Sequence, residues 1–81
     1  MKIKILGTSG TKSQKLEKTI RAAVRELSID AEIERVEDLS MIMEYPILAP
    51  PGLVIDEELV CSGRIPTKIE VHGFLLTELA R

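Results

Sequence analysis

Hydrophobic and polar residues alternate over residues 2–6, Lys-Ile-Lys-Ile-Leu, and this run meets a glycine at position 7. Alternation with a period of two is typical of a strand with one buried face. The same rhythm returns over residues 31–36, Ala-Glu-Ile-Glu-Arg-Val, and predicts a second strand. Because a helix and short joints are all that separate the two strands, we expect a right-handed crossover and parallel pairing.

Between those strands, apolar residues recur at the spacing of one helical face, and charged residues occupy the rest of the surface. The apolar face consists of Leu16, Ile20, Ala23, Val24 and Leu27. Thr11 and Gln14 have the spacing of a capping box, in which each side chain bonds a free backbone N–H at the start of a helix. The pattern therefore predicts an amphipathic helix that begins near Thr11, directly after the small residues 7–10.

A short helix is predicted over residues 38–44, with Asp38 as its cap. Tyr45-Pro46 ends it, because the residue before a proline is pushed out of the helical region. The apolar residues expected to face inward or to lie in the core are Leu39, Met41, Ile42 and Met43.

Two short apolar runs, residues 53–55 and 59–61, flank the turn residues 56–58 and predict a β-hairpin. The closing helix is expected to start at Thr67, which has a second capping-box spacing with Glu70. Its buried stripe is expected to contain Val71, Phe74, Leu75 and Leu79. The predicted order is β-α-β-α-β-β-α, an α/β architecture with a mixed four-stranded sheet and helices on both of its faces.

Length and composition agree with one small domain that spans residues 1–81. The formal net charge is −2 with both signs mixed along the chain, and Tyr45 and Phe74 are the only aromatic residues, so we expect no nucleic-acid binding. No apolar run has the length of a membrane span, and the alternating start does not resemble a secretion signal. We therefore expect a cytoplasmic protein that is a monomer or a weak dimer.

A single cysteine, Cys61, excludes a disulfide bond within the chain. Small secreted domains usually carry cysteines in pairs, so a lone cysteine agrees with a cytoplasmic location. The one histidine, His72, lies far from Cys61 along the sequence. One thiol and one imidazole at such a spacing do not predict a metal site, and we expect no cofactor.

The element order is that of the thioredoxin fold, and three stretches carry a closer resemblance. They are residues 2–8 together with the helical Gln-Lys-Leu-Glu at 14–17, residues 49–56, Ala-Pro-Pro-Gly-Leu-Val-Ile-Asp, and residues 62–67, Ser-Gly-Arg-Ile-Pro-Thr. Together they resemble the small archaeal and bacterial thioredoxin-like proteins often called redox-active disulfide protein 2, which lie between glutaredoxins and thioredoxins. The resemblance implies a thioredoxin fold and a relation to thiol–disulfide chemistry.

The chain departs from that family at the redox motif. In the family the loop after the first strand carries Cys-x-x-Cys, and the resemblance places those two positions at Gly10 and Ser13. A thiolate must attack a disulfide and a second thiol must resolve the mixed disulfide, so glycine and serine cannot run the two-cysteine cycle. The resemblance also implies that Pro51 is the family's cis-proline, which lies opposite the redox loop and exposes backbone groups to an extended peptide.

Two hypotheses follow. In the first, the protein is a non-catalytic module that binds an unidentified peptide or protein in a groove, with the binding residues Ser9, Thr11, Lys12, Pro50 and Pro51. In the second, it is a thiol–disulfide oxidoreductase that acts through Cys61 alone, with glutathione or a partner protein. The first is preferred, because reactive cysteines usually lie at helix N-termini or beside cations, whereas Cys61 is predicted to lie in a strand.

Overall fold

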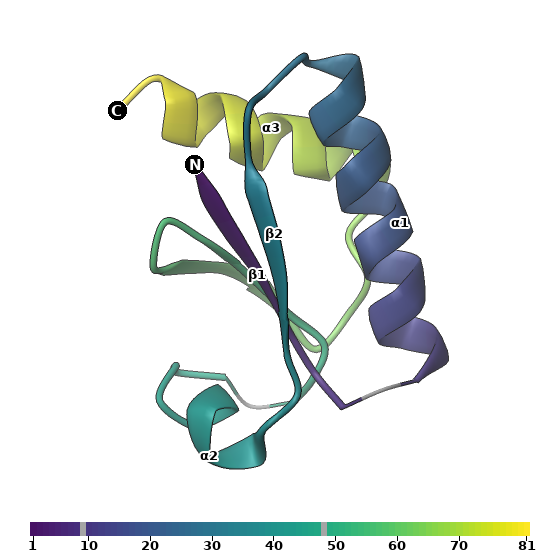
Figure 1. The fold of residues 1–81 in the computed structure, drawn as a ribbon, viewed down its shortest axis with the longest axis vertical. Helices are drawn as coiled ribbons and strands as arrows, with labels where there is room; N and C mark the ends of the chain where they lie inside the picture. The colour runs from purple at the N-terminus through teal and green to yellow at the C-terminus, as the bar shows by residue number, and fades with distance from the viewer. Residues whose placement is uncertain (9, 48) are drawn as a thin grey trace.

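The computed structural model describes residues 1–8, 10–47 and 49–81. Its elements follow the predicted order (Figure 1): β1 (Lys2–Leu6), α1 (Thr11–Glu26), β2 (Glu32–Val36), α2 (Leu39–Ile42), β3 (Gly52–Ile55), β4 (Glu58–Ser62) and α3 (Lys68–Leu79). This order confirms the predicted α/β fold class. None of the helices in the described residues is long and apolar enough to cross a membrane.

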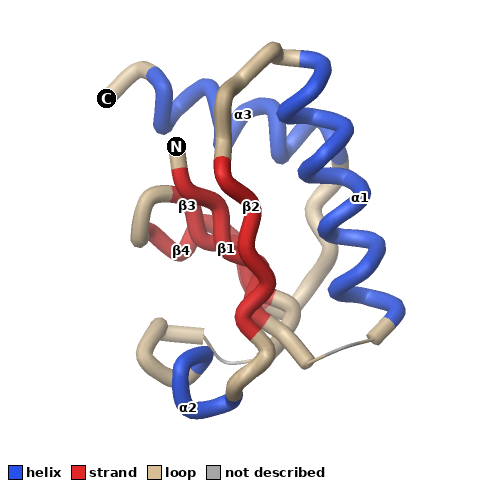
Figure 2. The backbone as a smooth tube through the Cα atoms, viewed as in Figure 1, coloured by secondary structure: helices blue, strands red, loops and turns tan. Residues whose placement is uncertain are grey.

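The four strands form one mixed sheet in the order β2-β1-β3-β4 (Figure 2). β1 pairs with β2 in parallel, as the connecting helix requires, and Ile3 lies opposite Ile33. β3 runs antiparallel to both β1 and β4. The turn between β3 and β4 places Asp56 and Glu57 at positive φ, which reverses the chain within two residues. β2 and β4 are therefore the two edges of the sheet.

The core lies mainly between the sheet and one pair of helices. Alternate residues of β1 and β3 pack against the apolar face of α1 and the inner side of α3, which lie on the same side of the sheet in Figure 2. The fully buried members of this cluster are Ile3, Ile5, Leu16, Ile20, Ala23, Leu53, Ile55, Val71 and Leu75. A smaller cluster on the opposite face joins Leu6, Val36 and Val54 to Ile42 of α2. Helices thus lie on both faces of the sheet, as predicted, although α2 covers only a small part of the face on which it lies.

The two predicted capping boxes have different outcomes. At α3 the prediction is confirmed: the Thr67 hydroxyl accepts from the Glu70 N–H at 3.2 Å, and the Glu70 carboxylate accepts from the Thr67 N–H at 3.0 Å. At α1 the prediction is wrong, because the cap residue is Gly10 and no side chain among the described residues bonds the free N–H groups. Thr11 is already the first helical residue, one position too late to act as the cap.

Several residues expected in the core are exposed. In α2 Ile42 is buried, but Leu39 and Met41 face solvent, and so does Met43 directly after the helix. A helix of four residues makes about one turn, so it has one inward position rather than a stripe. In α3 Leu79 is 54% exposed, because its neighbour Glu78 takes the inward position and leaves only 8% of its side chain exposed.

Candidate functional site

The loop from β1 into α1 is built around a close approach between Gly7 and Ser13. A Cβ atom at Gly7 would lie 2.6 Å from the Ser13 Oγ, and the φ of Gly7 is +158°, so a glycine is required here. Ser13 is only 4% exposed, and its hydroxyl donates to the Thr8 carbonyl at 3.1 Å. The chain therefore holds the side chain of residue 13 in the interior at the start of α1.

Pro50 and Pro51 lie opposite this loop. The peptide bond between them is cis, which is the isomer that the resemblance implies. Pro51 is buried, and its carbonyl accepts from the Gly63 N–H at 2.9 Å, which ties the segment to the end of β4. Pro50 is exposed, and its Cβ lies 3.7 Å from the position that a Cβ at Gly7 would occupy. The two prolines thus lie beside the loop that follows β1.

A cavity of about 220 Å³, called the groove below, opens between this loop and the prolines. Its lining residues are Thr8, Gly10, Thr11, Lys12, Ser13, Pro50 and Pro51. Four residues predicted for the binding site therefore lie together: Thr11, Lys12, Pro50 and Pro51. Ser9, the fifth, lies outside the described residues. Thr8 was missed, although its position between Gly7 and the helix start is a signal that could have identified it.

The groove has a polar and electropositive side. The first N–H groups of a helix have no partner within the helix, and within residues 1–8, 10–47 and 49–81 no side chain caps those of α1. No acidic residue lies in the first turn, and Lys12 lines the groove. The positive end of the helix dipole and the ammonium group act in the same direction. This side of the groove therefore favours acceptor groups, such as carbonyl or carboxylate oxygens.

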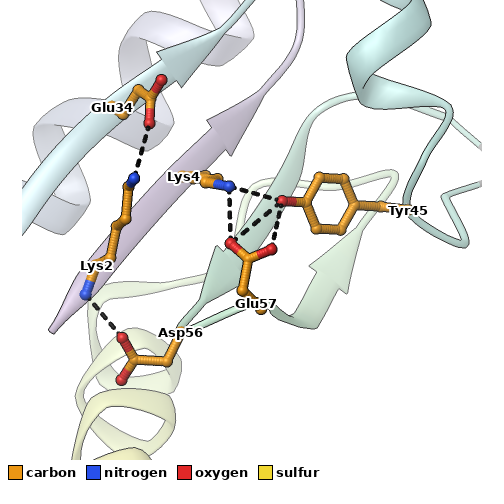
Figure 3. A network of polar contacts seen from close by, with 6 residues as sticks. All are labelled: Lys2, Lys4, Glu34, Tyr45, Asp56 and Glu57. Atoms are coloured by element: carbon orange, nitrogen blue, oxygen red, sulfur yellow. Dashed lines mark hydrogen bonds and ion pairs between the residues drawn. The ribbon is translucent and has the colours of Figure 1, made fainter.

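A cluster of charged and hydroxyl groups fixes the segment that leads to the prolines (Figure 3). The Lys4 ammonium lies 2.9 Å from the Tyr45 hydroxyl and 2.7 Å from the Glu57 carboxylate. Hydrogen bonds to Glu57 and then to Tyr45 raise the pKa of Lys4, and the same lysine lowers the pKa of Glu57. The cluster links β1, the turn after β3 and the residue where the chain leaves α2, so it holds the start of the proline segment.

Cys61 lies apart from the groove lining. It is on β4 opposite Leu53, and it belongs to the core cluster between the sheet and the helices. Its thiol donates to the Arg64 carbonyl, with the sulfur 4.0 Å from the oxygen. The Arg64 guanidinium itself binds Glu70 through two nitrogens, at 2.9 and 2.6 Å, and with the Thr67 N–H it holds the pKa of Glu70 at about 2.

Among the other hollows formed by the described residues, two are larger than the groove. One of about 280 Å³ is beside α1 and β2 and is lined by Gln14, Glu17, Lys18, Arg21 and Arg35. Glu17 pairs with both Arg21 and Arg35, at 2.9 and 3.6 Å, but the buried Nε and Nη2 atoms of Arg35 have no hydrogen-bond partner among the described residues. The other, about 340 Å³, follows the charged edge of the sheet at Lys2, Glu32, Ile33 and Glu34. Within residues 1–8, 10–47 and 49–81, no three His, Cys, Asp or Glu side chains come together as a metal site.

A β-α-β-α-β-β-α domain with a cis-proline opposite the loop that follows its first strand has the architecture of the thioredoxin-like proteins. Residues 1–76 match the thioredoxin domain family, and the chain belongs to this family. It is similar to thioredoxin from Methanothermobacter thermautotrophicus, with 45% identity over 75 residues, 93% of this chain and 97% of that protein. It is also similar to thioredoxin from Methanocaldococcus jannaschii, with 38% identity over 77 residues, 95% of this chain and 88% of that protein. The resemblance drawn from the sequence is thus confirmed for the family.

Proposed function

We propose that this thioredoxin-domain protein binds an extended segment of a peptide or protein in the groove and runs no thiol–disulfide cycle. The observation that carries the proposal is a complete groove without thiols. At the positions where the family resemblance places cysteines, Gly10 has no side chain and the Ser13 hydroxyl is buried and bonded to Thr8. The one cysteine, Cys61, is not among the residues that line the groove.

The two sides of the groove complement a peptide backbone. The first turn of α1 offers the N–H groups of Thr11, Lys12 and Ser13, which a helix leaves without internal partners. Pro50 and Pro51 have no N–H, so their side of the groove offers carbonyl acceptors only, and the Pro51 carbonyl already accepts from the Gly63 N–H. An extended chain carries donors and acceptors in alternation and can bond both sides. A segment with a carboxylate directed at Lys12 would gain a further charge-assisted contact.

The burial of Cys61 counts against the second hypothesis, a one-cysteine oxidoreductase. A thiol must be accessible as a thiolate to exchange with a disulfide. Cys61 instead packs in the core cluster with its sulfur near the Arg64 carbonyl. The Arg64 guanidinium forms its two hydrogen bonds with Glu70.

Restoring the thiols tests whether the groove is still built for an extended substrate. We would make Gly10→Cys with Ser13→Cys in a Cys61→Ala background and measure the reduction of insulin by dithiothreitol. The thiolate at position 10 would attack an insulin disulfide and release one insulin thiol. The thiol at position 13 would then displace the second, leaving a disulfide in the protein that dithiothreitol reduces again. We expect the double variant to accelerate the reaction and the parent chain to stay at the background rate.

Binding without chemistry is then measured on the unmodified chain. The probe is reduced and carboxymethylated insulin B chain, which is extended and cannot form disulfides. In ¹⁵N-labelled protein we expect shift changes at the amides of Gly10, Thr11 and Lys12, and weaker changes in a Lys12→Glu variant. The proposal fails if no groove amide shifts while the restored double variant is folded but inactive. Reduction of insulin by the unmodified chain, lost in Cys61→Ala, would instead establish the one-cysteine hypothesis.

A further inference from the structure

The charged residues on the outward side of α1 are all basic. At about 100° per residue, four exposed residues lie opposite the buried side of the helix, and they are called the basic face below: Lys15, Lys18, Arg21 and Arg25. The two acidic residues of α1, Glu17 and Glu26, lie toward its flanks. α1 has five basic and two acidic residues, whereas the rest of the chain has six basic and eleven acidic residues. Positive charge is therefore concentrated on one helix of a chain whose formal net charge is −2.

Most cations of the basic face have no carboxylate partner. Arg21 pairs with Glu17 at 2.9 Å, and it is the only one of the four in an ion pair among the described residues. Outside α1 every basic side chain pairs with a carboxylate: Lys2, Lys4, Arg35, Arg64, Lys68 and Arg81. An anionic partner could thus bind to the basic face without breaking an ion pair at three of its four positions.

The hollow between α1 and β2 lies along the basic face, since Lys18 and Arg21 belong to both. Arg35 of β2 forms its opposite wall, and the buried Nε and Nη2 atoms of Arg35 have no hydrogen-bond partner within the part of the chain that the structure describes. The carboxylates of Glu17 and Glu37 lie 3.6 Å from these atoms, too far for a hydrogen bond. Buried donors without an acceptor are costly, so the hollow contains a guanidinium that still requires one.

We propose that the basic face and this hollow bind an acidic segment of another protein, with one carboxylate of that segment in the hollow at Arg35. The Arg35 side chain is 26% exposed, so it reaches the hollow, and its planar guanidinium is suited to holding both oxygens of a carboxylate. Further carboxylates of the segment would lie along Lys15, Lys18 and Arg25. The site is separate from the groove, so it can be occupied whether or not the groove holds a peptide.

An acidic polypeptide fits this surface better than a nucleic acid does. The two aromatic residues of the chain are engaged elsewhere, Tyr45 with Lys4 and Phe74 against the core, so neither is available beside α1 for stacking a base. Nucleic acids carry a charge on every phosphate, and such a backbone would also meet the fixed carboxylates of Glu17 and Glu37 next to the hollow. A peptide can space its carboxylates to avoid them.

A titration of the ¹⁵N-labelled full chain at low salt tests the proposal. The probe is a synthetic peptide of alternating serine and glutamate, about eight residues long, which when extended spans the 16 residues of α1. We expect shift changes at the amides of Lys15, Lys18 and Arg21 and at the side-chain Nε–H of Arg35. The same peptide with glutamine in place of glutamate should cause no change, and added salt should weaken the binding.

Two variants separate recognition from net charge and from a structural role. Lys18→Gln should weaken binding by about two- to fivefold, whereas Lys2→Gln removes the same charge on the other face of the sheet and should leave the affinity unchanged. Arg35→Lys keeps the charge but loses the planar donor pair, and it should weaken binding by about tenfold. The thermal midpoint of the peptide-free Arg35→Lys protein should not fall, because the change removes buried donors that lack an acceptor.

Three results would overturn the proposal. The first is the absence of shift changes on α1 and at Arg35 with the glutamate peptide. The second is equal weakening by Lys18→Gln and Lys2→Gln, which would mean that only the net charge of the protein matters. The third is tighter binding of an oligothymidylate of the same length, which would assign the basic face to single-stranded nucleic acid.

Discussion

The contact between Gly7 and Ser13 can be tested by a double-mutant cycle. Gly7→Ala would place a Cβ atom 2.6 Å from the Ser13 Oγ, on a backbone with φ of +158°. Ser13 cannot simply move away, because it is 4% exposed and its hydroxyl donates to Thr8. Relief of the clash therefore requires the hydroxyl to leave its hydrogen bond or the start of α1 to shift.

The expected magnitudes follow from these contacts. A non-glycine residue in this φ region costs about 1–3 kcal/mol, and loss of the serine hydrogen bond costs about 0.5–1.5 kcal/mol. Gly7→Ala should thus lower the free energy of unfolding by about 2–4 kcal/mol. In Ser13→Ala the Oγ is absent, and the Ser13 Cβ lies at an ordinary 3.8 Å from the new methyl group. The double variant should therefore be more stable than the sum of the single effects by about 1 kcal/mol.

Urea unfolding at constant pH, analysed by linear extrapolation, measures the four free energies of the cycle. The matched control is Gly63→Ala, since Gly63 also has a positive φ, +79°, but an added Cβ there meets nothing within 4 Å among the described residues. Gly63→Ala should lower the free energy of unfolding by the backbone cost alone. Its effect on that free energy should add to the effect of Ser13→Ala without an interaction between the two. If Gly7→Ala and Ser13→Ala are additive within about 0.3 kcal/mol, the close approach at the site is not present in solution.

Three further predictions concern α3. Thr67→Ala removes the cap hydroxyl and should lower the free energy of unfolding in urea by about 1 kcal/mol. The pKa of its partner Glu70 is about 2, against the usual 4.5, so the carboxylate stabilises the fold above about pH 4.5 and loses this effect as the pH falls toward 2. Glu70→Gln should therefore be destabilising at pH 7 and neutral near pH 2. Burial first, and then the Glu58 carboxylate, raise the pKa of Glu78, so its ionised form disfavours the fold as the pH rises above 4.5. Glu78→Gln should therefore raise the urea midpoint at pH 7 and have no effect below pH 4, whereas a lower midpoint at pH 7 would mean that the ion pair with Arg81 outweighs burial.

The sequence predicted the elements whose pattern extends over several residues on one face. The alternation at residues 2–6 and the apolar face of residues 16–27 are long enough to define a strand and a helix without tertiary information. The predicted capping box at Thr11 was wrong. Threonine and glutamine at that spacing fit a cap, but the helix begins at Thr11 itself and Gly10 is the cap residue. Helix boundaries shift by a residue or two for little energy, so spacing alone did not separate the two registers.

The groove was predictable in part. The sequence pattern of a strand, a loop of small residues and a helix is enough to place Gly10 and Ser13 at a helix start. Only the family resemblance indicated that Pro50 and Pro51 lie opposite them. The contact of Gly7 with Ser13 has no signature in the sequence, because it depends on the angle between β1 and α1. That contact explains why the loop begins with a glycine, and it is available only from three-dimensional geometry.

The error at Leu79 arises from the apolar character of α3. Apolar residues occur around most of this helix, so periodicity could not separate the side that packs on the sheet from the side that does not. Val71 and Leu75 face the sheet, Glu78 completes that side, and Ile69, Leu76 and Leu79 remain outward. A helix that is apolar on both sides is stable in water only at the cost of exposed hydrocarbon, unless something covers it. The pattern of α3 is therefore ambiguous, because the exposed Ile69, Leu76 and Leu79 are of the same residue type as the buried Val71 and Leu75.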